Sequence, residues 1–67
     1  MTDRLIRIRE VTALTGKSRA SVYRGMANGT FPPSVRIGQD AVAWPESAIA
    51  RWIEERKAEA GYVSEAA

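Results

Sequence analysis

The stretch REVTALTGKSRASVYRGMANG, residues 9–29, decides the fold of this chain because it holds two short helix signals separated by a glycine. In its first half, Val11 and Leu14 stand three residues apart, which is the spacing of one helical face. Gly16 follows as a stop signal. These features predict a two-turn helix over about residues 9–15.

The second half of the stretch carries the signals of another helix. Ser18 stands where an N-cap residue is expected, and its hydroxyl can accept hydrogen bonds from the amides of the next turn. Val22 and Met26 form an apolar pair four residues apart behind it. Asn28-Gly29 is suited to a left-handed C-cap. We therefore predict a helix over about residues 19–28, joined to the first by a glycine-containing turn.

A hairpin is predicted after this pair of helices. Phe31 is a single large apolar anchor, and Pro32-Pro33 stiffens the chain that follows it. Apolar residues then alternate with polar or small ones over residues 35–37 and 42–44, on both sides of a turn at residues 38–40. This period of two predicts two short strands with a polar tip.

The remaining segments complete the predicted architecture. A brief edge strand is predicted over residues 4–8, and a third helix from 45 to about 59 with Pro45 at position N1. Arg51 and Glu55, four apart on that helix, can form an ion pair. The expected core contains Val11, Leu14, Val22, Met26, Phe31, Trp44, Ile49, Trp52 and Ile53. The predicted fold class is mostly α: a winged helix-turn-helix with three helices and a two- or three-stranded antiparallel wing. This domain covers residues 1–60, and a disordered tail follows over 61–67.

Length and composition exclude several classes of protein. The chain has 67 residues and contains neither cysteine nor histidine. Disulfides, thiolate metal sites and the commonest general base are therefore absent, so we expect no enzyme, no metal and no cofactor. No segment resembles a leader peptide or a membrane span, and we expect a cytoplasmic protein.

The charged residues are unevenly distributed along the chain. Residues 1–39 carry seven lysines and arginines against two acidic residues, a net charge of +5, whereas residues 40–67 have a net charge of −3. Six of the seven N-terminal cations are arginines, whose planar fork of donors suits phosphates and base edges. This half of the chain could meet a polyanion, although a solvated surface without a partner has the same composition.

Seven short motifs in register also carry a family resemblance. They are Arg9-Glu10-Val11, Leu14-Thr15-Gly16, Ser18 to Arg24, Gly29 to Pro33, Val35 to Gly38, Val42 to Ser47, and Trp52-Ile53. Together they resemble the AlpA family of prophage regulators over roughly residues 4–57. Residues 31–48 are also similar to phage excisionases, which share the MerR-like winged-helix fold. The resemblance implies a sequence-specific DNA-binding protein of a phage or prophage that regulates transcription or bends DNA for excision by an integrase.

On this reading the second helix enters the major groove and the wing reaches the DNA backbone or minor groove. We expect Arg24 to contact a base edge or a phosphate, and Arg19 and Arg36 to contact phosphates. For Arg36 the alternative is an ion pair with the third helix. The full set of candidate DNA-binding residues is Lys17, Ser18, Arg19, Ala20, Ser21, Tyr23, Arg24, Arg36 and Gln39.

Two positions depart from the family pattern. The wing tip has Gln39-Asp40 where these families commonly carry an arginine, and the Asp40 carboxylate would repel phosphate. Gly25 stands where a larger apolar residue is usual. It either permits close packing or weakens the helix.

A second class of function stays open at this stage. Glu54, Glu55 and Glu59 give the third helix an acidic side that could dock a basic protein partner. For the DNA-binding reading, a monomer has a small footprint on DNA. We therefore expect several copies on repeated sites, or a partner such as integrase or RNA polymerase.

Overall fold

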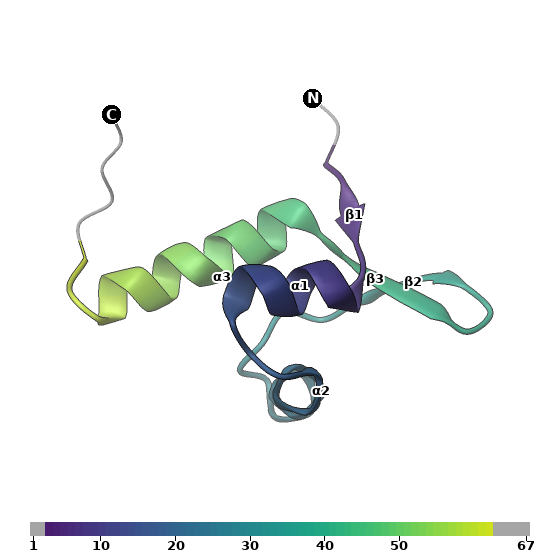
Figure 1. The fold of residues 1–67 in the computed structure, drawn as a ribbon, viewed down its shortest axis with the longest axis horizontal. Helices are drawn as coiled ribbons and strands as arrows, with labels where there is room; N and C mark the ends of the chain where they lie inside the picture. Colours follow the sequence, from purple (N-terminus) through teal and green to yellow (C-terminus); the bar gives the residue numbers. More distant parts are fainter. Residues whose placement is uncertain (1–2, 63–67) are drawn as a thin grey trace.

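The computed structural model describes residues 3–62 and contains three helices and one small sheet (Figure 1). In chain order the elements are β1 (Leu5–Ile6), α1 (Ile8–Thr15), α2 (Arg19–Asn28), β2 (Val35–Gly38), β3 (Ala41–Pro45) and α3 (Glu46–Glu59). The sheet is antiparallel with strand order β1-β3-β2. This architecture is a winged helix-turn-helix, as the sequence predicts. The edge strand predicted over residues 4–8 is present but shorter, because Ile8 already belongs to α1.

The signals that end α1 and begin α2 act as predicted. Gly16 takes a left-handed conformation with φ of 75°, and its N–H donates to the carbonyl of Thr12. The Ser18 hydroxyl oxygen accepts the N–H of Ser21 at 3.1 Å. The sharp turn between the two helices therefore comes from local chemistry alone.

A few apolar side chains from the three helices, from β1 and β3 and from the segment after α2 make the core. Ile6, Val11, Val22, Phe31, Trp44 and Ile49 are buried, and Met26, Trp52 and Ile53 are partly buried against them. Leu14 is an exception to the predicted core, because it is 49% exposed. It lies at the end of a two-turn helix, on the rim of an open hollow shared with Ile53 and Tyr62, so only one side of it is packed.

Close packing explains the glycine inside α2. Gly25 is buried, and a Cβ added there would lie 2.8 Å from the Cβ of Phe31. Its carbonyl also accepts the N–H groups of Thr30 at 2.8 Å and Phe31 at 3.1 Å, which folds the following segment back onto the helix. Of the two roles considered for Gly25, the structure supports close packing.

The N-terminal segment holds the beginning of α3. Pro45 is the extended N-cap of that helix rather than its first helical residue, because β3 continues through it, and it offers no side-chain cap. Asp3 supplies the cap instead: its carboxylate accepts the Ser47 N–H at 3.0 Å and the Ser47 hydroxyl at 2.6 Å. These two hydrogen bonds lower the pKa of Asp3 below its ordinary value.

Arg4 adds an ion-pair cluster to this contact. Its guanidinium binds both carboxylate oxygens of Glu46, at 3.2 and 3.0 Å, and one oxygen of Glu10 at 2.9 Å. The pairing lowers the pKa of Glu46 and raises that of Arg4. Since these groups are largely exposed, the cluster fixes the path of the chain more than it adds stability.

The far end of α3 closes with a glycine. Gly61 has φ of 89°, its N–H donates to Ala58 O, and the Tyr62 N–H donates to Lys57 O. This pattern is a Schellman cap. Residues 63–67 of the predicted tail lie outside the described residues.

Two further features of α3 concern its charges and its length. Within residues 3–62 no ion pair joins Arg51 to Glu55, and the pairs on this helix are Lys57–Glu54 and Arg56–Glu59, each three residues apart. The Arg51–Glu55 prediction is therefore wrong. In this pair the cation comes four residues before the acid, which is the less favourable order on a helix. None of the helices in the described part of the chain is long and apolar enough to cross a membrane.

Candidate nucleic-acid interface

One side of α2 presents charged and small residues to solvent. Val22 and Gly25 are buried and Met26 is partly buried, which sets the inward face of the helix. Arg19, Ala20, Tyr23 and Arg24 are exposed. Because α2 packs against α1 and stands apart from α3 in Figure 1, this exposed side is open to a large partner. Ala20 and Arg24 therefore lie on the exposed side, as the helical period predicts, whereas Ser21, predicted on the same side, is partly buried.

The next two predicted residues lie at the start of α2, Ser18 as its N-cap and Ser21 in its first turn. Ser18 is exposed, and its oxygen already accepts the amide of Ser21, which leaves its hydroxyl hydrogen as a donor. Ser21 is partly buried at the border of the exposed side.

Lys17 differs from the other predicted residues. Its Nζ lies 5.7 Å from the ring centroid of Trp52 on α3, a cation–π distance. The side chain is partly buried and directed toward the third helix. It would have to leave the indole to reach a phosphate from the α2 side.

Tyr23 combines packing with exposure. Its ring meets Trp44 edge-on, with centroids 6.3 Å apart and an interplanar angle of 61°. The residue is still 38% exposed. Tyrosine commonly places its apolar body on a core and its hydroxyl in water, and the position of Tyr23 allows both.

The wing carries Arg36 and Gln39. The hairpin projects from the body of the protein, away from the C-terminal end of α3 (Figure 1). Arg36 is exposed, and its Nη2 donates to the Gln39 carbonyl at 3.3 Å, so the guanidinium lies at the wing tip. No ion pair joins it to α3 in the part of the chain that the structure describes. The alternative role considered for this residue is therefore absent.

Not all seven cations of residues 1–39 are available to bind a polyanion. Arg4 is held by Glu10 and Glu46 and adds little net charge. Arg19 and Arg24 on α2 and Arg36 on the wing are exposed and outside these pairs. Two arginines at the start of α1, Arg7 and Arg9, are also exposed, although the sequence assigned them no site.

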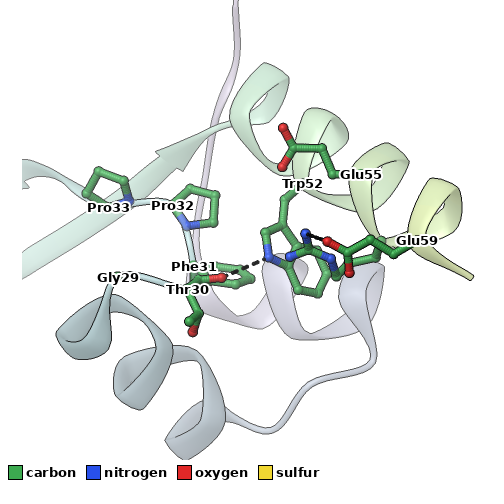
Figure 2. A pocket seen from close by; sticks show the side chains of 9 residues that line it. Gly29, Thr30, Phe31, Pro32, Pro33, Trp52, Glu55 and Glu59 are labelled. Atoms are coloured by element: carbon green, nitrogen blue, oxygen red, sulfur yellow. Dashed lines mark hydrogen bonds and ion pairs between the residues drawn. The ribbon is translucent and has the colours of Figure 1, made fainter.

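A groove that the sequence did not predict lies on another part of the molecule, between α3 and the segment that links α2 to β2 (Figure 2). This open groove has a volume of about 610 Å³ and is lined by Gly29, Thr30, Phe31, Pro32, Pro33, Trp52, Glu55, Arg56 and Glu59. The Trp52 indole N–H donates to the Thr30 carbonyl at 3.2 Å. The centroids of the Trp52 and Phe31 rings are 5.1 Å apart. The guanidinium of Arg56 lies 5.2 Å from the same indole and pairs with Glu59.

Comparison with known proteins gives two matches. Residues 4–57 match the model of a family described as prophage CP4-57 regulatory protein (AlpA). The chain is also 39% identical over 51 residues to an uncharacterized protein, ORF88, of Enterobacteria phage P4. This alignment covers 76% of the chain and 58% of the relative, so the chain spans little more than half of the phage protein.

Proposed function

This chain belongs to the AlpA family of prophage regulatory proteins, a family of phage-type DNA-binding regulators, and on that premise we propose how it reads DNA. In this proposal α2 enters the major groove of a specific duplex site, and the wing contacts the neighbouring backbone or minor groove. The observation that carries the proposal is the two-sided character of α2. Arg19, Ala20 and Arg24 are exposed on a short helix whose other side is locked into the core by Val22 and Gly25.

The candidate residues take different roles in this proposal. Arg24 contacts a base edge, because its long bidentate fork projects from the middle of the recognition helix. Arg19 and Arg36 contact phosphates, at the start of α2 and on the wing. The remaining contacts come from small or polar groups that border them, namely Ser18, Ala20, Ser21, Tyr23 and Gln39, and from Lys17 if its ammonium leaves Trp52.

Salt-dependent binding tests this proposal. A duplex selected by the protein from a random pool, and a scrambled duplex, are titrated at several salt concentrations. With two or three cations on phosphates, we expect log affinity against log salt to fall with a slope of about −2 to −3. Absence of binding to any duplex, or binding that salt does not change, would exclude the DNA-binding mode proposed here.

Regulation of transcription is the action that we propose for the bound protein. The family description as a regulatory protein supports it. The second candidate is that of an excisionase, which shapes DNA for an integrase. A promoter reporter that responds to the protein without integrase supports the first, and excision in a reconstituted integrase reaction supports the second. RNA polymerase is the partner in the first case, and integrase in the second.

We also propose that the protein is a monomer in solution and binds repeated sites in several copies. A single module of this size buries a small area on DNA, so neighbouring copies or a tethered partner must raise the affinity. Sedimentation of the free protein and of its complex with one or two adjacent sites measures the copy number directly.

The alternative function is a protein-interaction module. The acidic rim of the groove, Glu55 and Glu59, favours a basic partner, but Glu59 already pairs with Arg56. Glu55→Lys separates the two functions: it removes a protein contact in the alternative, whereas DNA binding by α2 and the wing is retained.

A further inference from the structure

The outer strand of the wing contains an extra residue next to its tip. Val35 pairs with Ala43 and Arg36 with Val42, but the next pair joins Gly38 to Ala41. Ile37 is therefore additional on β2. Such irregularities bend a strand and re-aim a side chain, and they are common beside functional sites.

Ile37 is poorly covered by its own protein. It is 45% exposed on a hairpin that projects from the helices (Figure 1). Every residue of β2 is exposed, so the core does not account for a large aliphatic side chain at this position.

The groups around Ile37 point to the kind of surface that it meets. The Arg36 guanidinium is held at the wing tip by the Gln39 carbonyl, and the turn itself carries Gln39 and Asp40 instead of a cation. The wing thus combines one exposed cation, Arg36, with an adjacent aliphatic group. Proteins that bind the minor groove use this combination, with a cation on the backbone and an apolar wedge at a base step.

We propose that Ile37 enters the minor groove and, by wedging at a base step, bends the DNA toward the major groove. This inference rests on the proposed placement of the wing against DNA. It adds a residue and an action that the basic residues do not supply.

The experiment measures DNA bending and affinity together. A duplex selected by the wild-type protein from a random pool carries a fluorophore at each end, and the bend is read from energy transfer at saturating protein. Ile37→Thr removes the apolar end of the side chain but keeps the β-branch that suits a strand. Ile37→Leu keeps an aliphatic group of the same size. Val35→Thr is the matched control, because Val35 is 42% exposed on the same strand but farther from the tip.

We expect a wild-type bend of about 20–90°, the range of apolar wedges. Ile37→Thr should lose at least half of it and bind about 10-fold more weakly, with an unchanged salt slope because no charge is removed. Ile37→Leu and Val35→Thr should bend DNA like the wild type.

Three results would overturn the inference while leaving DNA binding intact. They are a wild-type complex without a bend, an unchanged bend with Ile37→Thr, and equal losses with Ile37→Thr and Val35→Thr. A wild-type protein that binds no duplex would instead overturn the proposed function as well. Circular dichroism of each variant checks that the fold is retained.

Discussion

At the scale of single residues, Arg24 is the side chain on which sequence specificity is predicted to depend. It is exposed in the middle of α2, on the side away from buried Val22. If its fork reads a guanine edge, Arg24→Ala should lose about 1–3 kcal/mol on the selected duplex and much less on a scrambled one. Competition binding with the two duplexes measures this difference.

Arg36→Ala is the matched comparison for Arg24→Ala. As a phosphate contact, Arg36 should contribute equally to both duplexes, and its loss should reduce the salt slope by about one unit. Equal losses on both duplexes for Arg24→Ala would make Arg24 a phosphate contact too. No loss on either would mean that α2 does not enter the groove.

Gly25 gives a second prediction at this scale, concerning stability. Alanine favours a helix over glycine by about 1 kcal/mol, but its Cβ would lie 2.8 Å from the Phe31 Cβ. Because this contact is inside the core, we expect Gly25→Ala to destabilise the protein by about 1–3 kcal/mol in urea unfolding.

Gly38→Ala serves as the control for this prediction. A Cβ at Gly38 would meet the Ala41 Cβ at 3.5 Å, an ordinary contact, so this change should leave stability almost unaltered. A stabilised Gly25→Ala variant would show that Phe31 moves aside easily.

At the scale of elements, the wing is predicted to contact DNA although one residue of its tip, Asp40, repels phosphate. Asp40 is exposed in the turn between β2 and β3. Asp40→Arg should tighten binding to selected and scrambled duplexes alike and steepen the salt slope, because an added phosphate contact carries no sequence information. The same titrations measure both effects. Unchanged or weaker binding by the folded variant would place the tip away from DNA.

At the scale of the whole molecule, the contact between the N-terminal segment and α3 should make stability sensitive to acid. The Ser47 hydrogen bonds lower the pKa of Asp3, and Arg4 lowers that of Glu46. A carboxyl whose pKa is lower in the folded state stabilises the protein at pH values above its ordinary pKa of about 4. This contribution is lost as the pH falls through the lowered folded pKa.

Asp3→Ala tests this prediction by removing the carboxylate that caps α3. At pH 7 the variant should unfold at a lower urea concentration than the wild type. As the pH falls below about 4 the two midpoints should approach each other, because the wild type then loses the same charge. In a Ser47→Ala background, adding Asp3→Ala should lower the urea midpoint at pH 7 by less than it does in the wild type, because the hydroxyl hydrogen bond is already lost. A gap between Asp3→Ala and wild type that stays constant with pH would show that the charge of Asp3 is unimportant.

The sequence alone determined the elements and most of the candidate interface. Apolar spacing, the Ser18 cap and the Gly16 stop predicted α1 and α2 to within a residue. The same helical period predicted that Arg24 would lie on the exposed side of α2, opposite Val22. These features follow from interactions over three or four residues, which a linear pattern contains.

Only the tertiary structure decided which distant residues meet. Asp3 reaches Ser47, 44 positions away, and Lys17 lies over Trp52 instead of facing outward with α2. Leu14, which has core spacing, is left at the rim of the packed helices. In each case the outcome depends on how separate elements pack in space, and neither period nor charge along the chain specifies that path.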